Sequence, residues 1–182
     1  MARVPYVNRE ELDAEGQEIY DRIRSDRNAD TVGLQFRALL HRPRVASFLT
    51  SMGAELRFRS AMPEDIKEFA IIVLAREWNS DIEWTAHAAL AAKAGVGAES
   101  IEAVRTRKPL SALTEPEQVI ARFVLELLRE KKLSDETFAA AEKLLGTQGA
   151  VDLTLTCGYY TAINMAQIAL KPEMEAGKAS TL

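Results

Sequence analysis

Cysteine and histidine are scarce in this sequence. The chain of 182 residues has one cysteine, Cys157, and two histidines, His41 and His87. A single thiol cannot form an intramolecular disulfide, a Cys-x-x-Cys redox pair or a cysteine-rich zinc site. Two imidazoles are too few for a three-histidine metal centre. Thiol–disulfide cycling and the commonest zinc sites are therefore excluded.

Residues that interrupt helices are also few, with nine glycines and six prolines. No segment alternates apolar and polar residues with the β-branched enrichment typical of a strand. At 47% hydrophobic residues, the chain has enough apolar side chains to bury a core. We expect a single all-α domain over residues 1–182, built from about seven to eight helices. The segments that matter below are expected helices at 10–24, 64–78, 81–94, 134–145 and 149–170, and a disordered tail over 172–182.

No long apolar run is present, and neither sign of charge dominates. The longest apolar stretch, Phe69 to Ala75, is far too short to cross a membrane. The first residues lack the apolar segment of a signal peptide and are too acidic for a transit peptide, so we expect a cytoplasmic protein with no membrane partner. The 23 Lys and Arg residues face 27 Asp and Glu residues, a formal net charge of −4. That balance argues against general polyanion binding, and we expect no nucleic-acid partner.

One face of the helix expected at 81–94 carries polar and aromatic side chains. A spacing of three and four residues places four of them on one side: Ser80, Glu83, Trp84 and His87. Glu83 and His87 are four residues apart, close enough for the carboxylate to hydrogen-bond the imidazole. Such a contact raises the pKa of a histidine and fixes its tautomer, and both effects favour acid–base catalysis.

Glu68 lies in the helix expected at 64–78, which is apolar on nearly all sides. A buried carboxylate is costly unless it is paired or protonated, so Glu68 requires a partner. His87 or a backbone donor is the candidate partner. Glu68, Glu83 and His87 are the strongest catalytic candidates in the chain, and they predict proton transfer by a histidine and two carboxylates.

Structural roles compete with this interpretation. Ser80 and Glu83 fit a capping box, in which Ser80 caps the helix start and Glu83 reaches back to the N-cap backbone. Trp84 fits a core or interface aromatic residue, His87 a satisfied core histidine, and Glu68 a structural hydrogen-bond acceptor. A metal bound by Glu68, Glu83 and His87 is a further alternative, since carboxylates and imidazole suit iron or manganese. Because a Glu-x-x-x-His spacing is common on helices, we expect no metal.

Residues outside these two helices are weaker candidates. Tyr160 and Asn164 share one face of the helix expected at 149–170 and are able to line a pocket, although tyrosine hydroxyls also commonly cap cores. Arg57 and Arg59 are able to receive a substrate carboxylate or to solvate a helix end. Cys157, in an apolar helix, is expected to be a small buried hydrophobe rather than a nucleophile.

The segment REWNSDIEWTAH at residues 76–87, followed by an alanine-rich run to Val96, resembles the carboxymuconolactone decarboxylase family of the alkylhydroperoxidase D-like superfamily. The likeness extends to residues 36–43, 63–75 and 133–160, and so covers about residues 30–170. The resemblance implies an alkylhydroperoxidase D-like helical fold that assembles as a homo-oligomer, either a dimer, a trimer or a hexamer.

The chain departs from the peroxidase branch of this superfamily at its thiols. That branch uses a glutamate, a Cys-x-x-Cys pair and then a histidine four residues after the second cysteine. Counting back from His87 places Glu83 and Ser80 at the two cysteine positions, and Glu68, twelve residues before Ser80, at the glutamate. A hydroxyl and a carboxylate cannot run a thiol–disulfide cycle, so thiol-dependent peroxidase activity is excluded.

The resemblance to the decarboxylase branch implies a cofactor-free lyase that removes carbon dioxide from a small carboxylated lactone or oxo acid. In that interpretation His87, oriented by Glu68 or Glu83, protonates the enolate left by decarboxylation, while Trp84 and Tyr160 exclude water. The residues expected to contact the small-molecule substrate are Ser80, Trp84, Tyr160, Asn164 and Arg57. Three alternatives stay open: a lactone isomerase or hydrolase of the same fold, metal-dependent oxygen chemistry, and a non-catalytic helical oligomeric module.

Overall fold

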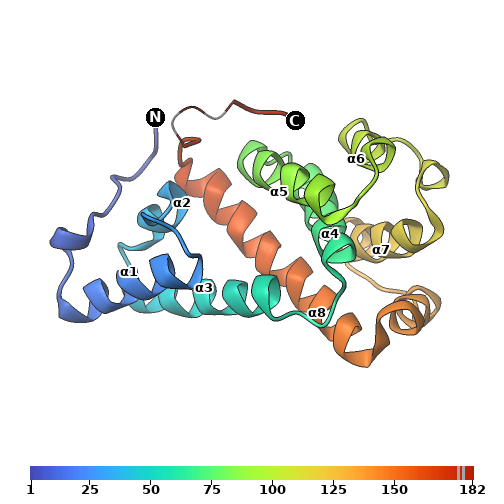
Figure 1. Cartoon of the computed structure of the whole chain (residues 1–182), viewed down its shortest axis with the longest axis horizontal. Coiled ribbons are helices and arrows are strands. Elements are labelled where there is room, and N and C mark those ends of the chain that lie inside the picture. Colours follow the sequence, from blue (N-terminus) through green and yellow to red (C-terminus); the bar gives the residue numbers. More distant parts are fainter. Residues whose placement is uncertain (176, 178) are drawn as a thin grey trace. The chain divides into compact units, whose positions relative to one another are not determined.

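The computed structural model describes residues 1–175, 177 and 179–182 (Figure 1). Within that part of the chain there are eight α-helices and no β-strand, so the all-α prediction is confirmed. The α-helices are α1 (Ala14–Asp26), α2 (Leu34–Leu39), α3 (Pro43–Phe58), α4 (Glu64–Glu77), α5 (Asp81–Ala94), α6 (Ala98–Arg105), α7 (Glu115–Leu125) and α8 (Asp135–Leu170). None of the helices described is long and apolar enough to cross a membrane.

Short turns of other helix types supplement the α-helices. Arg9–Glu11 and Leu110–Ala112 are 3-10 turns, and Glu126–Glu130 is a π-helical turn directly after α7. The helical hydrogen-bond pattern therefore changes from α to π after Leu125.

The chain forms two compact units. The first comprises Met1–Arg59 with Met165–Ala179, and the second comprises Ser60–Asn164 with Ser180–Leu182. In the first unit α3 packs against both α1 and α2, and the side chains of Ile23 and Phe36 are buried. The prediction of one domain over residues 1–182 stays a prediction.

The first helix begins later than the sequence pattern indicates. The predicted range was 10–24, whereas α1 begins at Ala14 and a separate 3-10 turn occupies Arg9–Glu11. The reason is the side chain of Asp13, which accepts a hydrogen bond from the Gly16 backbone N–H at 2.8 Å and so caps the new helix. The Asp13 cap therefore decides where the α-helix begins.

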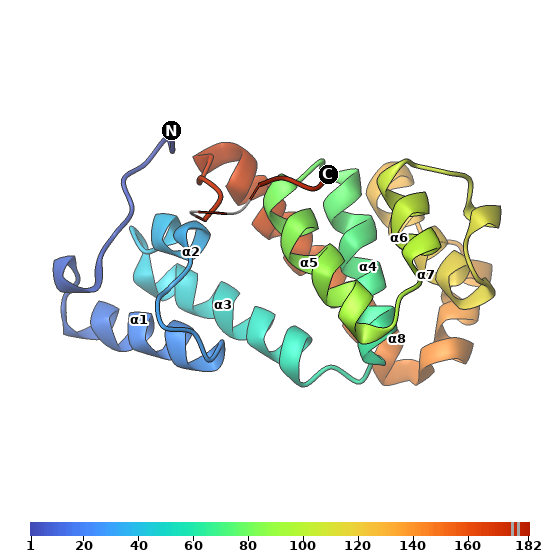
Figure 2. The same cartoon turned by 45° about the horizontal axis from the view of Figure 1, so that its top comes forward.

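Helix α4 is the centre of the second unit. Every residue from Phe69 to Ala75 is buried, as the apolar run predicts. It packs against α5, α6 and α7 (Figure 2), so a helix with hardly any polar face is covered on several sides. Polar groups on α4 therefore need partners from neighbouring helices.

Local signals set the ends of α4 and α5. Pro63 occupies the N-cap of α4, one position before the expected first helical residue, with Glu64 and Asp65 in the first turn. Ser80 caps α5, and Gly95 ends it with φ 105°, a left-handed conformation that glycine adopts at little cost. The ends of these two helices are thus set by their own local sequences.

Helix α8 is interrupted at one glycine. Gly146 has φ 71° and ψ 170°, far from helical values, so two helical segments meet there. The sequence predicted helices at 134–145 and 149–170 with a break between them, and the break is confirmed. The second segment carries Tyr160 and Asn164.

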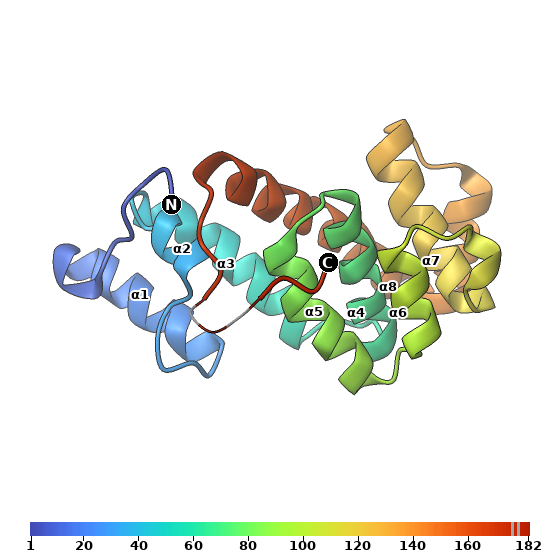
Figure 3. The ribbon, with the colours of Figure 1, turned by 90° about the horizontal axis from the view of Figure 1, so that it is seen from above.

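The end of the chain is described in part. Of the tail predicted to be disordered, residues 176 and 178 lie outside the described residues, and the rest contains no helix. Residues 180–182 lie beside α5 (Figure 3), where the Thr181 backbone N–H donates to Thr85 Oγ1 at 3.2 Å. Ser180 also hydrogen-bonds the carboxylate of Asp81 at the start of that helix.

Candidate functional site

Glu68 and His87 form a short, buried hydrogen bond between α4 and α5. His87 Nδ1 lies 2.6 Å from Glu68 Oε2, and the carboxylate accepts the Nδ1 proton. The two residues are 2% and 3% exposed. Of the two partners that the sequence left open for Glu68, the imidazole is the one observed.

The second ring nitrogen of His87 is also engaged. Glu83 Oε2 lies 3.4 Å from Nε2, one helical turn away on α5, and the Tyr160 hydroxyl from α8 lies 3.2 Å from the same nitrogen. The rings of His87 and Tyr160 meet edge to face, with centroids 5.3 Å apart. The imidazole is therefore fixed in orientation by groups from three helices.

The surroundings of His87 favour its protonated form. Burial by itself lowers the pKa of an imidazole, but hydrogen bonds to Glu68 and Glu83 raise it, and the net effect places the pKa of His87 above its ordinary value of 6.5. The imidazolium donates from Nδ1 to Glu68 and from Nε2 toward Glu83 and Tyr160. In the neutral form the Tyr160 hydroxyl is able to donate to Nε2 instead.

Ser80 and Glu83 realise only half of the predicted capping box. The Ser80 side chain accepts from the Glu83 backbone N–H at 3.3 Å, as an N-cap does. The Ser80 backbone N–H donates to the Ala75 carbonyl at 2.9 Å, and the Glu83 carboxylate lies near His87. Glu83 is only 4% exposed, so its side chain belongs to the buried cluster.

The other residues predicted to contact a substrate each lie in a different environment. Trp84 is fully buried in the second unit, as expected of a core aromatic residue. Asn164 is also buried, and its side-chain amide donates to the Tyr160 backbone carbonyl at 2.7 Å. Arg57 lies on α3 in the first unit, with its guanidinium 5.2 Å from the ring centroid of Phe58.

Thr156 on α8 is a candidate site residue that was not predicted from the sequence. It is buried one helical turn before Tyr160, and Asn164 lies one turn after it, so all three share a face of α8. Thr156 Oγ1 and Asn164 Oδ1 have no hydrogen-bond partner in the described part of the chain. Unpaired buried polar atoms are rare in proteins, and they often mark a position where water or a ligand binds. The sequence signal that could have indicated Thr156 is its position four residues before Tyr160, which places both side chains on one face of the helix.

Cys157 is not a reactive thiol. Its side chain is buried, and burial raises the pKa of the thiol to about 12. The thiolate is the reactive form of cysteine, so this residue is inert at neutral pH. The prediction of a small buried hydrophobe is confirmed.

Metal binding has no prepared site among the residues that the structure describes. No group of three or more His, Cys, Asp or Glu side chains in them is arranged to hold a metal ion. In the cluster around His87, both ring nitrogens face carboxylates rather than a common point.

Comparison with known proteins adds no assignment. No protein-family model matches the chain, and no curated protein matches its sequence.

Proposed function

We propose that this protein is a cofactor-free lyase of the carboxymuconolactone decarboxylase type, which removes carbon dioxide from a small carboxylated lactone or oxo acid. The observation that supports it best is the Glu68–His87 hydrogen bond of 2.6 Å, with Tyr160 at the opposite ring nitrogen. This arrangement holds a proton on an oriented imidazole, which is what general acid catalysis requires. A cytoplasmic location is part of the proposal.

The reaction assigns one proton to His87. The substrate carboxylate leaves as carbon dioxide, and the electron pair of the broken carbon–carbon bond passes into an enolate. His87 Nε2 donates its proton to the enolate carbon, because Nδ1 is held by Glu68. Water then restores the proton of the imidazole, so that each turnover consumes one proton and releases one carbon dioxide.

Each neighbour of His87 has a distinct role in this scheme. Glu68 fixes the ring and stabilises the imidazolium. Tyr160 donates toward the developing oxyanion when the substrate displaces its contact with Nε2. The unpaired oxygens of Thr156 and Asn164 offer acceptor positions on the same face of α8. An isomerase or a lactone hydrolase would use the same groups, and product analysis separates these reactions.

A second candidate function is a non-catalytic helical module. The burial of Glu68, Glu83 and His87 favours it, because none of the three is more than 4% exposed. A hydrogen-bonded core cluster with no catalytic task would have the same closed geometry. Catalysis instead requires side chains around His87 to move when substrate enters.

We further propose that the protein is a homo-oligomer, either a dimer, a trimer or a hexamer. Four large apolar side chains on α3 are exposed to solvent in the single chain: Val45, Phe48, Met52 and Phe58. Val45, Phe48 and Met52 follow a spacing of three and four residues, so they form one stripe, and Phe48 is 77% exposed. Contiguous exposed apolar surface of this kind marks protein interfaces. Light scattering of the purified protein checks this, and a mass of 20.2 kDa would contradict it.

Turnover of γ-carboxymuconolactone tests the lyase directly. Loss of the lactone is followed by ultraviolet absorbance and carbon dioxide is measured in parallel, with a small panel of β-oxo acids and other lactones. We expect His87→Ala to abolish turnover and His41→Ala to retain it, because His41 is exposed and its imidazole hydrogen-bonds the Pro5 carbonyl at 2.9 Å rather than a carboxylate. Lactone loss without carbon dioxide would assign a hydrolase or isomerase. Equal turnover in both variants would contradict the role of His87.

A further inference from the structure

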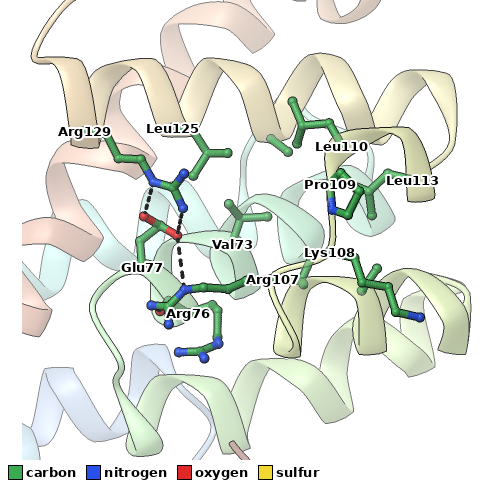
Figure 4. Close-up of a pocket in the computed structure, with 13 residues that line it drawn as sticks. Val73, Arg76, Glu77, Arg107, Lys108, Pro109, Leu110, Leu113, Leu125 and Arg129 are labelled. Atoms are coloured by element: carbon green, nitrogen blue, oxygen red, sulfur yellow. Dashed lines mark hydrogen bonds and ion pairs between the residues drawn. The ribbon is translucent and has the colours of Figure 1, made fainter.

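A second polar site lies in the unit that contains His87. A cavity of about 240 Å³ is lined by residues of α4, α6 and α7 and of the turns that follow α6 and α7 (Figure 4). Figure 4 shows Arg76, Glu77, Arg107 and Arg129 gathered at one end of the cavity, and Pro109, Leu110 and Leu113 at the other, on whose side Lys108 also lies. Val73 lies between the two ends. The cavity is therefore amphipathic along its length.

The charged end holds more cations than anions. Arg129 binds the carboxylate of Glu77 with two parallel hydrogen bonds of 2.6 and 2.7 Å. Arg107 Nε lies 3.9 Å from the same carboxylate. Arg76 also lines the cavity. The charged end therefore has three guanidinium groups and one carboxylate, and Arg129 already binds that carboxylate.

Arg76 and Arg107 are held side by side by a neutral group. The side-chain oxygen of Asn79 accepts from Arg76 Nη1 at 2.5 Å and from Arg107 Nη2 at 3.0 Å. Arg107 Nη2 also donates to the Arg76 carbonyl at the end of α4, at 3.1 Å. These contacts position both guanidinium groups without neutralising either charge.

The two positive charges disfavour one another. Burial lowers the pKa of Arg76, and the neighbouring charge of Arg107 lowers it further. An anion between them would remove this repulsion, and a planar guanidinium presents paired N–H donors that match a carboxylate. The charged end therefore has the electrostatic complement of a carboxylate.

We infer that this cavity binds a small carboxylic acid with a single-ring apolar body. The carboxylate is received by Arg76 and Arg107, and the ring lies among Val73, Leu110 and Leu113. A dry cavity of about 150 Å³ is known to hold benzene, so the 240 Å³ found here accommodate a ring with its carboxylate. The acid is held by charge at one end and by apolar contact at the other.

This site is distinct from the His87 cluster and does not depend on the proposed lyase activity. Glu68 and Glu77 are nine residues apart on α4. At about 3.6 residues per turn they point to opposite sides of the helix. Glu68 contacts His87, whereas Glu77 lies at the charged end of the cavity.

Benzoate is the probe for this site. Isothermal titration of the full-length protein is expected to show saturable binding of one benzoate per chain. Benzamide, which has the ring without the charge, is expected to bind at least about tenfold more weakly, because it cannot accept charge-assisted hydrogen bonds from the guanidinium groups. Acetate, which has the charge without the ring, is also expected to bind at least about tenfold more weakly, because it buries no apolar ring. Absence of saturation, or equal binding of benzamide, would overturn the inference.

Matched variants locate the binding. Arg107→Gln removes an exposed guanidinium, and we expect it to raise the Kd of benzoate at least about tenfold. Arg9→Gln is the control, because that half-exposed side chain pairs with Asp21 at 2.8 Å in the first unit and does not line the cavity, so the Kd should be unchanged. His87→Ala should also leave it unchanged. Loss of benzoate binding in His87→Ala, or an unchanged Kd in Arg107→Gln, would assign the ligand to another place.

Discussion

Glu68 and His87, nineteen residues apart in the chain, share a hydrogen bond of 2.6 Å in the interior of the second unit. Neither residue has appreciable contact with solvent. A buried carboxylate and a buried imidazole are each costly in isolation, and the pair removes part of both costs. The same bond raises the proton affinity of the imidazole, so one contact serves both the packing of α4 on α5 and the chemistry proposed for the site.

Glu68→Gln should lower the pKa of His87. The substitution keeps the shape of the side chain but removes one of the two carboxylates that hold the pKa of His87 above 6.5. We also expect a loss of about 1–3 kcal/mol in the free energy of unfolding, since a buried imidazole loses its charged acceptor. Titration of the two histidines by NMR measures this, with His41 as the internal control. An unchanged His87 titration would contradict the assigned role of Glu68.

The contribution of His87 to the free energy of unfolding should decrease as the pH rises. Because its pKa is raised in the folded protein, this contribution is fully present below pH 6.5 and is lost as the pH rises through the folded-state pKa. Between those values it declines by about 1.4 kcal/mol per pH unit. Urea unfolding of wild type and His87→Gln across a pH series isolates the effect. A difference that grows with pH would show that the pKa is lowered instead.

Tyr160→Phe separates the hydroxyl from the ring. The phenylalanine keeps the edge-to-face contact with His87 but removes the hydroxyl that lies 3.2 Å from Nε2. We expect the free energy of unfolding to fall by about 1 kcal/mol, and kcat on any accepted substrate to fall about tenfold or more, because an oxyanion donor is removed. Tyr20→Phe, on α1 in the first unit, is the control and should retain activity. Full activity in Tyr160→Phe would assign that hydroxyl to the core alone.

Gly146→Ala should destabilise the fold through the backbone alone. Gly146 has φ 71° and ψ 170°, a region that side-chain-bearing residues rarely adopt, yet a Cβ there would meet no atom within 4 Å. The expected cost is about 1–3 kcal/mol of unfolding free energy. Gly158→Ala is the matched control, because that glycine also has open space but lies within the helix, where alanine is preferred by about 1 kcal/mol. Thermal unfolding of both variants should therefore move in opposite directions.

Local sequence determined most of the secondary structure of this protein. Helical periodicity predicts the burial of Phe69–Ala75. Short-range preferences of the backbone and side chains predict the cap at Ser80 and the break near Gly146. The pairing of Glu83 with His87 also follows, since a helix brings residues four apart together. The late start of α1 was missed because several residues before Ala14 are equally able to begin a helix, and only the hydrogen bond of Asp13 selects one.

Tertiary packing decided the rest of the site. Tyr160 reaches His87 across 73 positions of sequence, and no periodic pattern specifies which residue of α8 faces α5. The choice of His87 over a backbone donor for Glu68 likewise depends on how α4 and α5 pack. The cavity lined by Arg76, Arg107 and Arg129 exists because α6, α7 and the turns after them place distant charges together. Helical periodicity fixes the face on which a side chain lies, but the partner of that face is chosen by the packing of the whole core.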